Sequence, residues 1–213
     1  MLQRSAGLTR GAVTVSRLLA CLLGLWFSPQ GFATSVIPPA FPELVNESDF
    51  IVRAKVESVV PEERTLPDGR QVVFSNVQLV VTETIAGKPP TPLVLRVLGG
   101  RIGDLDISIS GTPKFAVGDE SIFFVQGNGR QIYPLVRMMH GLYRVQKESG
   151  NGREYIERSD GVPLRNISDV ARPVRELALS AAERKALAAQ AMGPRDFMTQ
   201  IRAAATKSSL RAN

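Results

Sequence analysis

Hydrophobic and polar side chains alternate with a period of two along much of residues 49–160. This period is typical of β-strands that bury one face, because successive side chains point to opposite sides of a sheet. Turn residues separate the alternating runs, and no helical pattern lies between them. The strands that we expect are 49–60, ended by Pro61; 71–85, with a bend near Ser75 and Asn76; 93–97; 121–125; 131–135; 142–146; and 153–157.

Glycine-rich turns link several of these runs. Gly127-Asn128-Gly129 predicts a hairpin between strands 121–125 and 131–135, and residues 149–152 predict a second hairpin between the last two strands. The glycines of segment Gly99–Gly111 predict a flexible connection. Residues 122–125 are apolar without alternation, which predicts a strand buried on both faces. Together these features are typical of a closed or nearly closed antiparallel barrel, or of a sandwich.

Helical patterns follow the strands. Residues 177–192 are rich in Ala and Leu, and Ser180 and Glu183 have the spacing of a capping box. Gly193-Pro194 interrupts this helix, and residues 196–205 predict a second, short one. Its apolar residues share one helical face, so this tail either docks on the β-domain, carries an interaction, or is solvated; these residues are Phe197, Ile201 and Ala204.

The first 33 residues have the three parts of an export signal. Three arginines precede the apolar run 18–27, and the small residues Gly31 and Ala33 predict cleavage after Ala33. An uncleaved anchor or a buried core helix is the alternative, but a membrane span needs about 20 apolar residues. Lipidation at Cys21 is disfavoured because the apolar run straddles the cysteine. We therefore expect an exported protein, periplasmic or secreted, without an integral membrane span after cleavage.

Cleavage would change the composition that bears on function. It lowers the number of Lys and Arg from 26 to 23, against 20 acidic residues, and the formal net charge from +6 to +3. The pI of 9.9 is thus partly a property of the signal peptide, and we do not expect a nucleic-acid partner. The only Cys and the only Trp are also removed. The mature chain can form neither an internal disulfide nor a thiolate metal site.

Residues 41–56, which include Asp49-Phe-Ile-Val-Arg-Ala-Lys-Val56, resemble the opening of the netrin-like domain and especially of tissue inhibitors of metalloproteinases. Residues 77–87 are similar to that family's long strand running into a Gly turn. A closer likeness, over residues 41–147, is to a poorly characterised group of bacterial exported proteins. It rests on Asp49-Phe-Ile-Val52, Gly99-Gly100, Pro113-Lys-Phe115, Gly118-Asp-Glu120 and Phe123-Phe-Val125.

The resemblance implies a mainly β fold, an OB-like antiparallel β-barrel, here with a short α-helical C-terminal tail. The inhibitors of that family bind the protease zinc through an N-terminal cysteine, whereas the mature chain would begin at Thr34 without any cysteine. Their inhibitory mechanism therefore does not carry over. The expected organisation is a signal peptide (1–33), an extended leader (34–48), the barrel (49–160), a linker (161–176) and the helical tail (177–213).

Residue types and spacings argue against catalytic and metal chemistry. His140 is the only histidine, and no Gly-x-Ser-x-Gly motif supplies a nucleophile for a triad. With one histidine and no cysteine, the mature chain has too few of the ligands that zinc usually takes. Asp104 and Asp106 supply too few oxygen ligands for calcium. Residues 99–103 lack the Lys-Ser/Thr of a phosphate loop. We predict no catalytic residue, no metal site and no cofactor.

The sequence favours a noncatalytic exported binding module with an extracellular or envelope protein as partner. Two alternatives stay open: a regulator of secreted metalloproteases without the cysteine–zinc mechanism, and a carboxylate-based hydrolase. Binding sites are commonly glycine-rich loops and exposed polar or aromatic groups on a rigid scaffold. On that ground the candidate binding residues are Arg101, Asp104, Asp106, Arg137, His140 and Tyr143.

Overall fold

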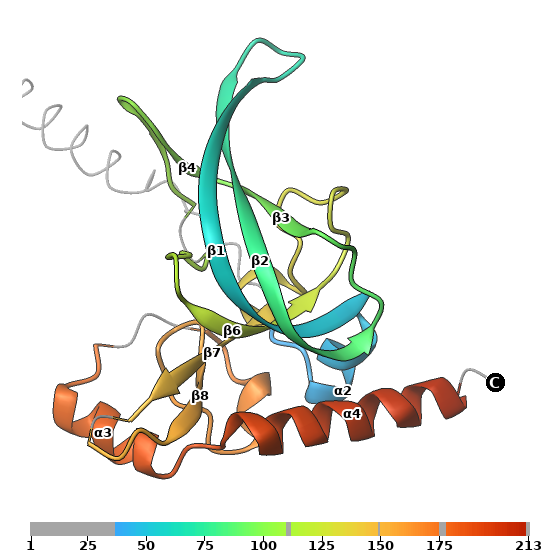
Figure 1. Cartoon of the computed structure of the whole chain (residues 1–213), viewed down its shortest axis with the longest axis vertical. Coiled ribbons are helices and arrows are strands. Elements are labelled where there is room, and N and C mark those ends of the chain that lie inside the picture. Colours follow the sequence, from blue (N-terminus) through green and yellow to red (C-terminus); the bar gives the residue numbers. More distant parts are fainter. Residues whose placement is uncertain (1–36, 110–111, 149, 175–177, 212–213) are drawn as a thin grey trace, which may run out of the picture. The chain divides into compact units, whose positions relative to one another are not determined.

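The structure, a computed structural model, describes residues 37–109, 112–148, 150–174 and 178–211. The expected signal peptide, with Cys21, lies outside these residues. The described chain is mainly β, with an antiparallel sheet and a few helices (Figure 1). Six strands pair in the order β3-β2-β1-β6-β7-β8. They are β1 (Phe50–Thr65), β2 (Gln71–Gly87), β3 (Leu93–Leu98), β6 (Glu120–Val125), β7 (Leu142–Lys147) and β8 (Glu154–Arg158).

A short hairpin and several helices complete the fold. The hairpin pairs β4 (Gly100–Ile102) with β5 (Leu105–Ile107). The helices are α2 (Phe41–Asn46), the 3-10 helices η1 (Met138–Gly141) and η2 (Ile167–Ala171), α3 (Ala181–Ala189) and α4 (Pro194–Arg211). Among the described residues, no helix is both long and apolar enough to cross a membrane. Their sheet does not close into a barrel, since β3 and β8 end the strand order.

Two hydrophobic cores lie on opposite faces of the sheet. Ile122 and Phe124 of β6 belong to the core that α2 and α4 cover. Phe123 and Val125 belong to the other core, which β1, β2 and β3 enclose. Because successive side chains of a strand alternate between its faces, β6 contributes to both cores and is buried on both sides. This confirms the prediction from its unbroken apolar run.

Strand β1 continues to Thr65, so the predicted end at Pro61 is wrong. Only residues 50–55 of β1 pair with β6, and the rest of the strand pairs with β2 alone in the sheet. A proline, which lacks an N–H, is tolerated where a strand has lost its second neighbour. The distal halves of β1 and β2 thus project as a two-stranded ribbon (Figure 1). Its register is regular at Ser75 and Asn76, and the irregularities lie between residues 51 and 58 of β1.

The predicted hairpin between residues 121–125 and 131–135 is also wrong. β6 pairs instead with β7, with Ile122 opposite Tyr143, and a single bridge joins Val125 to Leu135. Two hydrogen bonds hold the loop between Val125 and Leu135 against Asp49 and against β3. The Gly127 N–H donates to Asp49 Oδ2 at 2.7 Å, and Asn128 Nδ2 donates to the carbonyl oxygen of Val94 at 3.0 Å. The second predicted hairpin, β7–β8, is confirmed.

Helices form at both ends of the described chain. The expected extended leader contains α2, because its Pro42 lies in the first helical turn, where the missing N–H breaks no bond. Helix α3 begins with the predicted capping box: the Ser180 hydroxyl accepts from the Glu183 N–H at 3.2 Å. Helix α4 begins at Pro194, two residues before the predicted start, and extends beyond the predicted end.

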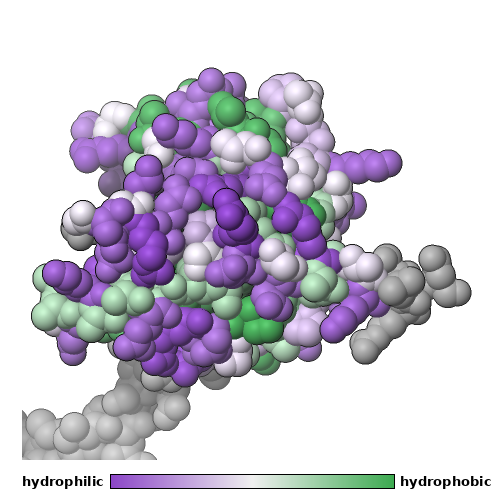
Figure 2. All heavy atoms as spheres, turned by 60° about the horizontal axis from the view of Figure 1, so that its bottom comes forward, coloured by the Kyte–Doolittle hydropathy of each residue, from purple (hydrophilic) through white to green (hydrophobic). Residues whose placement is uncertain are grey.

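The tail helix α4 packs into the core. Phe197 and Ile201 are fully buried. The Phe197 ring centroid lies 4.9 Å from that of Tyr143, 6.0 Å from that of Phe41 and 6.1 Å from that of Phe124. The opposite face of α4 is exposed and polar, and hydrophilic side chains cover most of the surface on this side of the molecule (Figure 2). Helix α2 of the leader, the strands and helix α4 of the tail therefore contribute to the same core, the one that α2 and α4 cover.

Candidate functional site

The predicted flexible segment 99–111 contains an ordered hairpin where the structure describes it. Strands β4 and β5 place Arg101 directly opposite Asp106, with Asp104 in the turn between them. All three side chains are exposed. The hairpin projects beside the β1–β2 ribbon (Figure 1). Three of the six candidate residues are thus gathered on one small element.

Two glycines fix where this hairpin leaves the sheet. The Gly99 N–H donates to the Val73 carbonyl oxygen, and the Ser75 hydroxyl donates to the Gly99 carbonyl oxygen, each at 2.8 Å. Gly100 has φ +140°, and a Cβ there would lie 2.5 Å from Ser75 Oγ. Only glycine combines this backbone angle with such a close approach. The Gly-Gly pair is thus a tight corner against β2.

A groove of about 450 Å³ opens beside the hairpin. Its walls come from β1 at Val59 and Pro61, from the end of β3, from the β4–β5 hairpin, from residues 112–115 and from Tyr133. We call it the hairpin groove. Most of these side chains are apolar, and the charged ones are Arg101, Asp106 and Lys114. Its size lies within the range of ligand pockets, about 300–1,000 Å³.

A second cavity of about 290 Å³ adjoins the hairpin groove and shares three of its residues. We call it the apolar lobe; it is lined by Leu98, Ile109, Gln131, Ile132, Tyr133 and Met138. The Tyr133 hydroxyl donates to the Pro113 carbonyl oxygen at 3.0 Å, and burial raises the pKa of this tyrosine. It therefore keeps its proton, and the residue lines both cavities.

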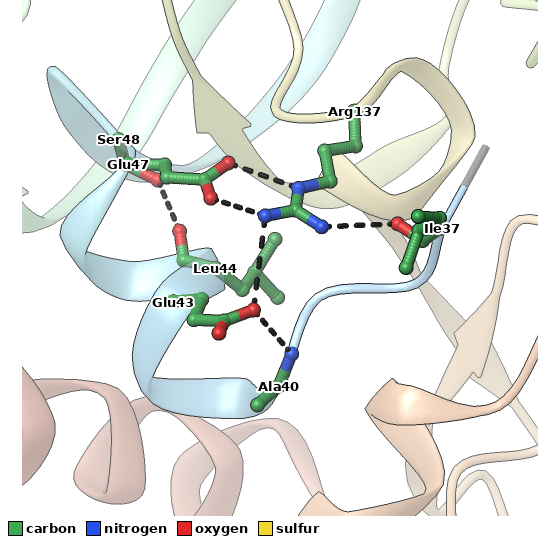
Figure 3. Close-up of polar contacts among 7 residues, drawn as sticks. All are labelled: Ile37, Ala40, Glu43, Leu44, Glu47, Ser48 and Arg137. Atoms are coloured by element: carbon green, nitrogen blue, oxygen red, sulfur yellow. Dashed lines mark hydrogen bonds and ion pairs between the residues drawn. The ribbon is translucent and has the colours of Figure 1, made fainter.

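Arg137 lies away from the hairpin and holds the N-terminal segment (Figure 3). Its guanidinium forms a two-point contact with Glu47, Nε to Oε2 at 3.2 Å and Nη2 to Oε1 at 2.6 Å. Nη1 donates to the Ile37 carbonyl oxygen at 3.1 Å, and Glu43 lies 3.7 Å from Nη2. This candidate residue is engaged within the chain.

The backbone at Arg137 and Met138 is strained. Their φ angles are 46° and 58°, a left-handed conformation that costs about 1–2 kcal/mol for each non-glycine residue. The contacts of Arg137 with Glu47 and Ile37 support this conformation. Met138 follows directly and lines the apolar lobe. The N-terminal segment is thus tied to one wall of the lobe.

The sequence predicts His140 and Tyr143 to be exposed, but the structure buries both. Only 3% of His140 and 2% of Tyr143 is accessible to solvent. Tyr143 packs against Phe124 and Phe197 in the core under α4. Both residues support the fold, so the six candidates do not converge on one surface.

We expect His140 to make the stability of the protein depend on pH. Burial first, and then the charges of Arg158 and Arg137, lower the pKa of His140 to about 4. In the unfolded chain its pKa is about 6.5, so between these values the unfolded state binds a proton that the folded state does not. Stability therefore falls as the pH is lowered through this window, by on the order of 3 kcal/mol.

The measurement compares the wild type with His140→Gln by urea unfolding at pH 7, 5.5 and 4. Titrating carboxyl groups are common to both proteins, so the difference between them isolates the histidine. The wild type should lose stability relative to the variant as the pH falls. A difference that stays constant across the three pH values would contradict the prediction.

The glycine-rich segment 99–111 was expected from the sequence to take part in binding, and several of its residues line the groove; the cavity residues outside that segment were missed by sequence reasoning. Lys114, Ile132 and Met138 come from three different segments between β5 and β7. Ile132 was expected only as part of a strand over residues 131–135, whereas the structure leaves it 61% exposed beside the lobe.

Within the described ranges, no three His, Cys, Asp or Glu side chains gather in a way that could hold a metal ion. The side chains that line the hairpin groove and the apolar lobe are mostly apolar. Comparison of the sequence with protein-family models gives no match, and comparison with curated proteins gives no match either.

Proposed function

We propose that the protein is an exported, noncatalytic binding module that takes its ligand in the hairpin groove and the apolar lobe. The observation that carries this proposal is the adjacency of the two cavities, which share Leu98, Ile109 and Tyr133. Ligand sites are typically concave and mostly apolar, with a few polar groups at fixed positions. The groove supplies that polar fringe, and the lobe supplies the apolar end. Residues 1–33 support the export part of the proposal.

The proposal includes an OB-like β-barrel as scaffold. Strand β1 supports it, because it pairs with β2 over its whole length and with β6 over residues 50–55. It thereby joins two parts of the sheet, and OB folds are partly open antiparallel barrels. In such folds ligands bind at loops beside the sheet. The β4–β5 hairpin and residues 112–115 are loops of this kind.

The test is a substitution of Ile132 by glutamate, with binding of an environment-sensitive naphthalene dye as readout. We expect the wild type to bind the dye saturably, and Ile132→Glu to bind it about tenfold more weakly, since a carboxylate in the lobe opposes apolar contact. Val80→Glu is the control, because Val80 is 47% exposed on β2 and lines neither cavity. Equal affinities of Ile132→Glu and Val80→Glu would remove the proposed site.

A further inference from the structure

We propose that the ligand is a small amphiphile with one acidic head group and an apolar chain. The head would lie at the mouth of the hairpin groove, and the chain would extend past Tyr133 into the apolar lobe. This inference rests on the proposed function and adds the chemical class of the ligand. Three observations support it: the positive charges at the mouth of the groove, the apolar lining of the lobe, and the hydrogen bonds that already occupy the outer edge of β3.

The mouth of the groove has more positive than negative charge. Its lining includes Arg101 and Lys114 against one carboxylate, that of Asp106. Among the described residues, no carboxylate forms an ion pair with either cation; Arg101 Nε only approaches the Gly103 carbonyl oxygen, at 3.4 Å. Both side chains are exposed and can reach a ligand. A carboxylate or a similar anion would complement them.

The apolar lobe favours hydrocarbon. Apart from Gln131 and the Tyr133 hydroxyl, which is bonded to Pro113, the side chains that line it are apolar, and Ile132 presents 61% of its surface to solvent. Covering apolar surface on binding stabilises a complex. Because the lobe adjoins the groove, one flexible chain can occupy both.

The neighbouring edge of the sheet argues against an extended peptide in this place. A peptide that adds to a sheet needs main-chain bonds along a free strand edge. The outer edge of β3 already donates from the Leu98 N–H to the Ile132 carbonyl oxygen at 2.8 Å. It also accepts from Asn128 at the Val94 carbonyl oxygen. These contacts occupy both ends of the edge, so a small amphiphile fits the observations better than a peptide strand.

The experiment uses three probes with the same twelve-carbon chain: dodecanoate, dodecylammonium and dodecanol. Each competes with the naphthalene dye on the full mature chain at concentrations below micelle formation. We expect dodecanoate to bind most tightly and dodecylammonium most weakly. Arg101→Gln and Lys114→Gln should each weaken dodecanoate about 2- to 5-fold, as for a partly exposed ion pair, and leave dodecanol unchanged.

Arg70→Gln is the matched control, because it removes the same charge from an exposed arginine in the β1–β2 turn, outside both cavities. Equal binding of the three probes, or a preference for dodecylammonium, would overturn the acidic head group and leave the cavities as a ligand site. Binding of an extended apolar peptide without binding of any of the three probes would overturn the amphiphile. If the dye itself shows no dependence on Ile132, the proposed function fails as well.

Discussion

Replacing Phe197 with alanine is expected to lower the free energy of unfolding by about 3–5 kcal/mol. The ring is fully buried and lies against Phe41, Phe124 and Tyr143. Its removal leaves a cavity where α2, α4 and the sheet meet, and the rigid strands can close it only in part. Urea unfolding followed by circular dichroism measures the loss.

Thr199→Ala is the control for helix propensity, because Thr199 is on the exposed face of α4. It should change the stability by less than about 0.5 kcal/mol. The comparison also decides between the alternatives that the sequence left open for the tail. A loss of under 1 kcal/mol on Phe197→Ala would mean that α4 is a solvated appendage, contrary to the structure.

The second large effect is expected at the corner of the β4–β5 hairpin, where Gly100→Ala should cost about 2–4 kcal/mol. The backbone angle of Gly100 is unfavourable for any side chain, and the added Cβ would meet Ser75 Oγ at 2.5 Å and Val73 Cγ1 at 3.2 Å. Either the Ser75 hydroxyl rotates away and loses its bond to the Gly99 carbonyl oxygen, or the hairpin shifts away from β2. Because the hairpin forms one wall of the groove, dye binding should weaken together with stability.

Gly103→Ala separates the effect of the backbone angle from the effect of the close approach of an added Cβ. Gly103 also has a positive φ, +56°, but a Cβ there would meet nothing within 4 Å. This variant should therefore lose only about 1 kcal/mol, from backbone strain, and keep the groove intact. If the two variants are equally stable and bind the dye equally well, then the close approach of Gly100 to β2 does not exist.

Strands could be predicted where the local pattern of apolar and polar residues matches the faces that the tertiary fold buries. The alternation in β1 and β3 and the unbroken apolar run of β6 follow directly from which faces are buried. The capping box of α3 is likewise a local feature. Residues 131–135 have the same local pattern, but the contacts of Gly127 with Asp49 and of Asn128 with Val94 decide their conformation. Those partners are distant in the sequence.

The candidate site was less predictable than the fold, because it is built from separate segments. Glycine-rich surroundings distinguish Arg101 and Asp106 in the sequence, and both residues line the groove. The sequence does not reveal that Phe197 of α4 packs against Tyr143, because that contact joins distant segments. Lys114 has no distinguishing local pattern. It lines the groove only through the way in which residues 112–115 pass the hairpin.

The double burial of β6 has a consequence for the order of folding. Phe50 lies opposite Val125 and Lys55 opposite Glu120, so a long loop must close before β6 can pair with β1. Until that happens, the apolar run 122–125 is accessible to other chains and is prone to self-association. Asp119 and Glu120 precede this run, separated from it by Ser121, and their negative charges oppose the stacking of identical segments. We expect the refolding yield to fall strongly as the protein concentration rises. We also expect these two acidic residues to oppose aggregation until β6 is covered.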